Sequence, residues 1–130
     1  MARVMFKLDL SKADDRLNWD YLRKVMEAFG FSRRCVDWIS VMISTLVFSI
    51  LLNGTPTHTF NASRGLRQGD PLSPFLFIIA AEGLGRYIKK EVQANKIKGI
   101  RAWGNDLPIT HQQFVDDIML FFHVSLREVK

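Results

Sequence analysis

The chain has 130 residues, a mass of 15.0 kDa and a formal net charge of +5, and 48% of its residues are hydrophobic. This length and apolar content are typical of one globular domain with its own core, and they exclude a disordered tail. A single cysteine, Cys35, excludes an intramolecular disulfide and a thiolate zinc cage.

The sequence also limits the setting in which the chain works. Its longest apolar run, Phe75 to Ala81, is far shorter than the roughly 20 residues of a membrane span. The N-terminal residues lack the pattern of a secretory signal peptide. We therefore expect a soluble intracellular chain. Its excess of Lys and Arg favours a polyanionic partner, either nucleic acid or an acidic membrane surface.

The first predicted elements are a strand and two helices. Residues 3–9, RVMFKLD, form a nearly continuous apolar run that is typical of a strand and ends at Asp9. Asn18 is the expected N-cap of the first helix and Gly30 its stop, and Ser32 is the expected N-cap of the second helix. Apolar residues at helical spacing predict the buried stripes, which are Trp19, Leu22, Met26 and Phe29 in the first helix and Val36, Ile39, Ile43 and Leu46 in the second.

A hairpin, a loop and a long helix are predicted next. Residues 47–60 hold two β-prone runs joined by the turn residues Asn53-Gly54. The segment SRGLRQGD, residues 63–70, reads as a loop rich in glycine and positive charge. Ser73-Pro74 is typical of an N-cap followed by the first helical residue, and predicts a helix that runs to about Ala94. A turn at residues 104–106 and two closing strands complete one α+β domain.

Asp116 and Asp117 are adjacent aspartates inside the run QFVDDIMLFF, which is otherwise apolar or neutral. Two such charges a few ångströms apart repel by roughly 4 kcal/mol where the effective dielectric constant is about 20. The pair therefore requires a solvent-exposed turn, a neighbouring cation, or protonation of one carboxyl group. A solvated hairpin tip meets the first requirement, and a metal ion meets the second.

Asp9 ends its strand in the same way, which makes a third candidate carboxylate. Convergence of Asp9, Asp116 and Asp117 would give the arrangement that a pair of Mg²⁺ ions needs, because magnesium prefers oxygen ligands. Two such ions about 4 Å apart can activate a 3′-hydroxyl and stabilise a leaving pyrophosphate. These residues thus indicate two-metal chemistry as the functional alternative to a solvated turn.

Three segments, in a fixed order, carry a family resemblance. They are KLDLSKADDRLNWDYL at residues 7–22, SRGLRQGDPLSPFLF at residues 63–77 and QFVDDIMLF at residues 113–121. In this order they resemble motifs A, B and C of reverse transcriptases, and RGLRQGDPLSP is the most specific of the phrases. Over essentially its whole length the chain is similar to the reverse transcriptase of plant-type non-LTR retrotransposons, the long interspersed elements.

The resemblance implies a fold and a reaction. The implied fold is an α+β fragment of a right-handed polymerase palm, in which a small antiparallel sheet is backed by two or three helices. The implied reaction is synthesis of DNA from deoxynucleoside triphosphates on a DNA primer, directed by an RNA template. The residues implied to hold Mg²⁺ or Mn²⁺ are Asp9, the backbone carbonyl of Leu10, Asp116 and Asp117. Those implied to lie beside the template base and the nucleotide are Asp14, Arg64, Arg67, Gln68, Gly69 and Asp70.

The chain departs from the family pattern in two ways. Asp14 stands where the family normally has an aromatic residue, and the resemblance implies that this ring lies against the nucleotide sugar and excludes a 2′-hydroxyl. A negative charge about 6 Å from the triphosphate would cost a few kcal/mol at an effective dielectric constant of about 20. In addition, no fingers or thumb segment is visible within these residues. We therefore expect weak or absent polymerisation by the isolated chain.

Other interpretations of the sequence stay open. A second enzymatic interpretation is that the chain comes from a related palm polymerase, such as an intron-encoded maturase. The chain could instead be a non-catalytic fragment of a decayed retroelement that binds nucleic acid or protein through its basic charge. A third possibility is a remnant that never folds stably and exposes apolar surface. If the parent element is active, its reverse transcriptase is expected in the nucleus.

Overall fold

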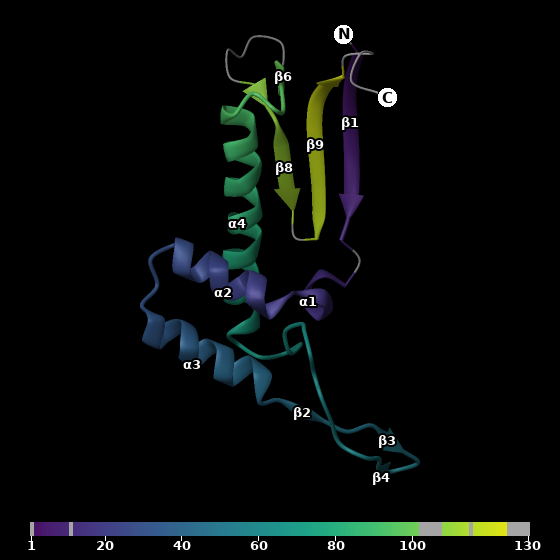
Figure 1. The fold of residues 1–130 in the computed structure, drawn as a ribbon. Helices are drawn as coiled ribbons and strands as arrows, with labels where there is room; N and C mark the ends of the chain where they lie inside the picture. Colours follow the sequence, from purple (N-terminus) through teal and green to yellow (C-terminus); the bar gives the residue numbers. More distant parts are fainter. Residues whose placement is uncertain (1, 11, 102–107, 115, 125–130) are drawn as a thin grey trace. The chain divides into compact units, whose positions relative to one another are not determined.

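The structure of the chain, a computed structural model, describes residues 2–10, 12–101, 108–114 and 116–124 (Figure 1). It has four helices and small antiparallel sheets among these residues, so the predicted α+β class is confirmed. The turn predicted at residues 104–106 lies outside the described residues. Two compact units are present, and we call Met1–Ser11 with Ala81–Lys130 the sheet unit and Lys12–Ala80 the helical unit.

The sheet unit contains a three-stranded antiparallel sheet. Its strands are β1 (Ala2–Asp9), β9 (Asp117–Val124) and β8 (His111–Phe114), and they lie in the order β1-β9-β8 (Figure 1). The strand predicted from the apolar run at residues 3–9 is therefore confirmed. A short antiparallel pair, β6 (Ile100–Arg101) with β7 (Pro108–Ile109), belongs to the same unit.

One face of this sheet is covered by the end of a long helix, α4 (Ser73–Gln93), whose residues from Ala81 onward belong to the sheet unit. The side-chain amide of Gln113 donates to the carbonyl of Ala81 at 3.3 Å. Gln113 lies opposite Ile118, which is only 4% exposed. Because side chains alternate along a strand, Asp9 and Asp117 lie on the other face of the sheet.

The helical unit begins with three helices. They are α1 (Ala13–Arg16), α2 (Trp19–Ala28) and α3 (Arg33–Ser44). Both predicted N-caps are confirmed. The Asn18 side chain accepts from the backbone N–H of Tyr21 at 2.9 Å, and the Ser32 hydroxyl accepts from that of Cys35 at 3.3 Å.

The core of the helical unit forms where these helices meet the segment after the hairpin. The predicted stripes supply its centre, because Leu22, Met26 and Val36 are each at most 2% exposed. Further buried members of the cluster are Ile43, Leu66, Leu76 and Ala80. Burying a side chain of this size contributes roughly 1.5–3 kcal/mol to stability. The helical spacing therefore identified the core residues that α2 and α3 contribute, but Leu46, which was predicted in the second stripe, lies beyond the end of α3 and is only partly buried.

The predicted hairpin is confirmed. Its inner strands are β3 (Leu51–Leu52) and β4 (Thr55–Pro56), and its outer strands are β2 (Val47–Phe48) and β5 (Phe60–Asn61). Asn53 and Gly54 both have positive φ, 51° and 81°, as a two-residue type I′ turn requires. Between the inner and outer pairs, residues 49–50 face residues 57–59, so one arm carries an extra residue.

The start of α4 differs in detail from the prediction. The helix includes Ser73, whose hydroxyl donates to the carbonyl of Arg67 at 2.7 Å instead of capping the helix. The Asp70 carboxylate accepts from the backbone N–H of Leu72 at 2.8 Å, which turns the chain into the helix. The last helical residue, Gln93, lies next to the predicted end at Ala94. None of the described helices is long and apolar enough to cross a bilayer.

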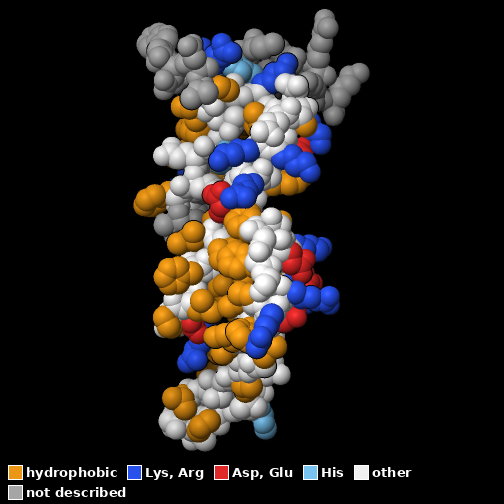
Figure 2. Space-filling model, turned by 90° about the vertical axis from the view of Figure 1, so that its left-hand side faces the viewer, with side chains coloured by type: hydrophobic (Ala, Val, Ile, Leu, Met, Phe, Trp, Pro, Cys, Tyr) orange, Lys and Arg blue, Asp and Glu red, His pale blue; other side chains and the backbone are white. Residues whose placement is uncertain are grey.

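Several large apolar side chains of the helical unit remain exposed. On α3, Trp38 is 59% exposed and Val41 is 58% exposed, and on the hairpin Leu51 and Leu52 are 69% and 66% exposed. Figure 2 shows hydrophobic side chains gathered at the surface. Singly exposed apolar residues are ordinary, but neighbouring ones favour association.

Candidate active site

The acidic residues of motifs A and C meet at one end of the three-stranded sheet. Asp9, the last residue of β1, lies directly opposite Asp117, the first residue of β9. Opposite residues of an antiparallel pair have Cα atoms about 4.5–5.5 Å apart and side chains on the same face. The backbone N–H of Leu10 donates to the carbonyl of Asp116 at 2.9 Å, which fixes the next residue pair. Four residues singled out in the sequence are thus neighbours in the main chain.

Lys7 is a neighbour of this cluster that the sequence analysis did not identify. Its ammonium nitrogen lies 2.9 Å from Oδ2 of Asp117. The hydrogen bond to Asp117, reinforced by the charges of Asp117, Asp9 and Asp116, raises the pKa of Lys7 above its ordinary value. Alternation along the strand was the available signal, because a residue two before Asp9 shares its face.

The donor set fits a hard divalent cation. Asp9 and Asp117 offer two carboxylates on one face of the sheet, and magnesium is usually bound by one or two protein carboxylates together with substrate phosphates and water. In the part of the chain that the structure describes, no group of three or more His, Cys, Asp or Glu side chains is arranged to hold a metal ion. The opposed pair, Asp9 and Asp117, is therefore the part of the predicted metal site that has a geometric basis.

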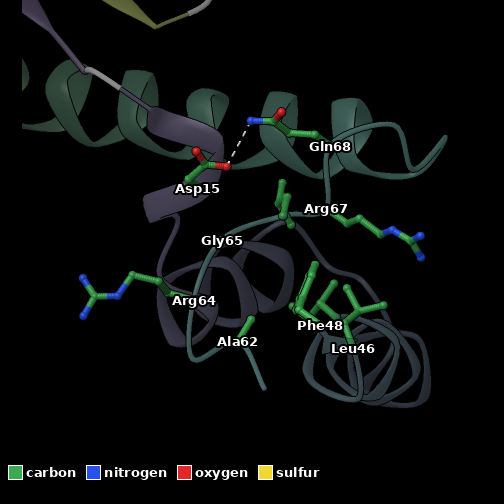
Figure 3. A pocket seen from close by; sticks show the side chains of 10 residues that line it. Asp15, Leu46, Phe48, Ala62, Arg64, Gly65, Arg67 and Gln68 are labelled. Atoms are coloured by element: carbon green, nitrogen blue, oxygen red, sulfur yellow. Dashed lines mark hydrogen bonds between the residues drawn. The ribbon is translucent and has the colours of Figure 1, made fainter. Parts of the chain in front are cut away.

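The motif B loop lies in the helical unit, where it is hydrogen-bonded to residues 14–19 of the motif A segment (Figure 3). The backbone N–H of Leu66 donates to the carbonyl of Asp14 at 2.8 Å, and that of Gly65 donates to Leu17 at 2.8 Å. The indole N–H of Trp19 donates to the carbonyl of Gly65 at 2.7 Å. Two segments almost fifty residues apart in sequence are thereby held together.

Gly65 is required at the point where these segments cross. Its φ is +85°, and a Cβ there would clash with the main chain of Asp15. Gln68 adds a side-chain contact, since its amide donates to Oδ1 of Asp15 at 3.2 Å (Figure 3). Neither Asp15 nor Trp19 was singled out as a site residue in the sequence. Their contacts depend on tertiary structure that local pattern does not reveal.

The remaining residues of the loop have distinct environments. Arg64 and Arg67 line a cavity of about 450 Å³, together with Asp15, Ile43, Leu46, Phe48, Ala62, Gly65, Leu66 and Gln68. Their guanidinium groups extend away from the other labelled side chains in Figure 3. Gly69 has a φ of +83° and no heavy atom within 4 Å of the position a Cβ would take. Asp70 is engaged in the turn into α4.

The predicted site residues therefore fall into two groups. Asp9, Leu10, Asp116 and Asp117 belong to the sheet unit, whereas Asp14 and the residues of the motif B loop belong to the helical unit. The structure brings each group together within its own unit.

Comparison with known proteins identifies the family. A family model described as reverse transcriptase (RNA-dependent DNA polymerase) matches residues 1–128. The chain is 33% identical over 103 residues, 77% of its length, to the retrovirus-related Pol polyprotein from the type-2 retrotransposable element R2DM of Drosophila melanogaster, and the match covers 10% of that protein. It is 43% identical over 67 residues to an uncharacterized mitochondrial protein of Arabidopsis thaliana, which is 52% of this chain and 55% of that protein.

A third relative covers more of the chain at lower identity. The uncharacterized 149 kDa protein of transposon TX1 of Xenopus laevis is 26% identical over 120 residues, which is 92% of this chain and 9% of that protein. The chain thus spans between about a tenth and about half of the length of these relatives. Motifs A, B and C and the family match agree, and the chain therefore belongs to the reverse transcriptase family, as a reverse transcriptase domain of the non-LTR retrotransposon type.

Proposed function

We propose that this chain is part of the palm of an RNA-directed DNA polymerase that extends a DNA primer on an RNA template by two-metal nucleotidyl transfer. The observation that carries the proposal is the opposition of Asp9 and Asp117 across β1 and β9. The resemblance to motifs A and C implies a catalytic role for both residues. Fingers, thumb and the rest of the palm would come from other segments of a longer protein, so residues 1–130 by themselves have little or no activity.

The residues of the sheet unit would hold the ions. The carboxylates of Asp9, Asp116 and Asp117 and the backbone carbonyl of Leu10 are the proposed ligands of Mg²⁺ or Mn²⁺. When bound, these ions supply Lewis-acid stabilisation of the charge on the primer 3′-hydroxyl and on the leaving pyrophosphate. The main-chain hydrogen bond from Leu10 to Asp116 keeps this end of the sheet in register before any ion arrives.

The residues of the motif B loop would receive the nucleotide and the template. Gly69, which has open space where a side chain would be, allows a base or sugar to approach the backbone. Gln68 and Asp70 border that position in sequence, and both are held by hydrogen bonds within the helical unit. Arg64 and Arg67 carry positive charge that would compensate phosphate groups of the bound nucleic acid.

The setting of the reaction is part of the proposal. An RNA template, a DNA primer and deoxynucleoside triphosphates are the expected partners, and membrane binding is not expected. The chain would act as a soluble protein inside the cell, and in the nucleus if its parent element is active. Support comes from the family match over residues 1–128 and from the net charge of +5.

The proposal is tested in a chimera that supplies the fingers, the thumb and the rest of the palm. Residues 1–128 replace the matching segment of the Drosophila R2DM Pol polyprotein, with Asp14→Tyr included, and RNA-templated primer extension is measured with Mg²⁺. Extension that is lost in Asp9→Asn and in Asp117→Asn, but retained in the exposed control Asp20→Asn, supports the proposal. Extension that survives both aspartate substitutions contradicts it.

A non-catalytic role for the basic chain remains the second candidate, and the net charge of +5 is the observation that favours it. It predicts binding to RNA and DNA that weakens steeply with salt, without any extension by the folded chimera. Binding with no Mg²⁺-dependent synthesis would therefore replace the first proposal with the second.

A further inference from the structure

Lys7 forms a salt bridge with Asp117, one of the metal ligands of the proposed function, and its inferred role rests on that function. Its ammonium nitrogen lies 2.9 Å from Oδ2 of Asp117, and alternation along β1 places it on the same face as Asp9. We propose that Lys7 is a built-in counter-ion that neutralises Asp117 when no metal is bound, and that it must leave this oxygen before a divalent ion can bind there.

The need for a counter-ion follows from the register of the sheet. Like charges directly opposite each other destabilise an antiparallel pair, and Asp9 faces Asp117 in this way. Asp116 adds a third carboxylate at the same end of the sheet. A cation beside Asp117 offsets this repulsion, so Lys7 keeps the ends of β1 and β9 paired while the site is free of metal.

The salt bridge between Lys7 and Asp117 can be broken easily when a divalent ion binds. The side chain of Lys7 is 58% exposed and that of Asp117 is 35% exposed, so water screens the pair from both sides. Lysine holds its charge on a flexible four-carbon stem and can move away without disturbing the backbone. A doubly charged ion attracts the carboxylates more strongly than the single ammonium does.

This role makes an unusual prediction. A residue that merely supports the site would weaken metal binding when it is removed. Lys7 is expected to do the opposite, because an incoming ion must enter against its positive charge and displace it. Removal of that charge should therefore strengthen binding, whereas a substitution that keeps the charge should not.

The test measures Mg²⁺ binding to the ¹⁵N-labelled chain by NMR at low ionic strength, following the amide signals of Leu10 and Asp116. Lys7→Gln should bind Mg²⁺ about three- to tenfold more tightly than the natural sequence. Lys7→Arg keeps the charge and should stay within about twofold. Lys24→Gln, which removes the same charge from an exposed position on α2, is the matched control and should bind as the natural chain does.

A second measurement separates binding from folding. Thermal unfolding is recorded with and without Mg²⁺, and the stabilisation by Mg²⁺ should be larger in Lys7→Gln than in the natural chain, even if the variant starts less stable. Equal or weaker binding by Lys7→Gln, or an equal gain in Lys24→Gln, overturns the role of Lys7 and leaves the metal site standing. If no variant responds to Mg²⁺, the metal site of the proposed function fails, and the role of Lys7 fails with it.

Discussion

Gly65 shows how much one residue contributes to the motif B loop. Its positive φ disfavours any side chain, and the main chain of Asp15 occupies the space where a Cβ would lie. Gly54 in the hairpin shares the positive φ, but nothing lies within 4 Å of its missing Cβ. A comparison of alanine substitutions at the two glycines therefore distinguishes the cost of backbone strain from the cost of a steric clash.

Gly65→Ala should destabilise the helical unit by more than about 2 kcal/mol, because strain and clash add. Gly54→Ala should cost only about 1–2 kcal/mol, because it meets strain alone. Urea unfolding followed by tryptophan fluorescence measures both variants. Equal costs would show that the crossing of Gly65 with Asp15 is not a close contact in solution.

Asp14 is the second residue whose identity matters, because it is expected to set the rate of primer extension. Its carbonyl accepts from Leu66, so the position of its main chain is fixed beside the motif B loop while its side chain is exposed. An aromatic residue there would restore the wall that the family resemblance implies. Under the proposed function, a carboxylate at this position would instead bring a negative charge toward the triphosphate.

In the chimera described above, Asp14→Tyr should raise primer extension by roughly ten- to a hundredfold over the unchanged Asp14. Asp14→Asn removes the charge without restoring the ring and should give an intermediate rate. Rates are compared at saturating primer and template and at several nucleotide concentrations. Equal extension with Asp and Tyr at this position would show that residue 14 does not face the nucleotide.

At the scale of elements, local signals predicted most of the secondary structure. Asn18 and Ser32 cap their helices as expected, and Asn53-Gly54 forms the hairpin turn, because these features depend on residues near one another in sequence. The crossing at Gly65 and the salt bridge of Lys7 were not predicted. The crossing at Gly65 depends on a contact between distant segments, which local periodicity does not encode. Alternation along β1 places Lys7 on the face of Asp9, but its partner Asp117 belongs to a strand distant in sequence.

The cap of α2 provides a test at this scale. Asn18→Ala removes the acceptor for the backbone N–H of Tyr21 and should cost about 1 kcal/mol. Asn18→Asp retains a good acceptor and should leave stability nearly unchanged. Chemical denaturation of the three proteins gives the comparison. An alanine variant as stable as the natural chain would contradict the cap.

At the scale of the whole molecule, the chain combines a buried core with unusual apolar exposure. Leu22, Met26 and Val36 are almost fully buried, yet Leu51 and Leu52 of the hairpin are more than 60% exposed. The family motifs predicted the site residues. Exposed apolar surface was expected only for a remnant that never folds stably, and the sequence did not indicate which residues would be exposed, since that depends on the packing of every element.

The exposed apolar residues should make the isolated chain self-associate at high concentration. Leu51→Lys combined with Leu52→Lys should shift the protein toward monomer, as measured by size exclusion with light scattering. The control is Lys24→Gln, which changes a charge away from the hairpin. A natural chain that stays monomeric at millimolar concentration would contradict the expectation.

The most direct test of the central claim is a crystal structure of the chain grown with Mn²⁺, in which anomalous scattering locates the ion. We expect a peak at the end of β1 and β9, at coordination distances of about 2.1 Å from carboxylate oxygens of Asp9 and Asp117, with Lys7 moved off Asp117. An ion bound elsewhere, or carboxylates of Asp9 and Asp117 that hold no ion at saturating Mn²⁺, would contradict the assignment of these aspartates as the metal site.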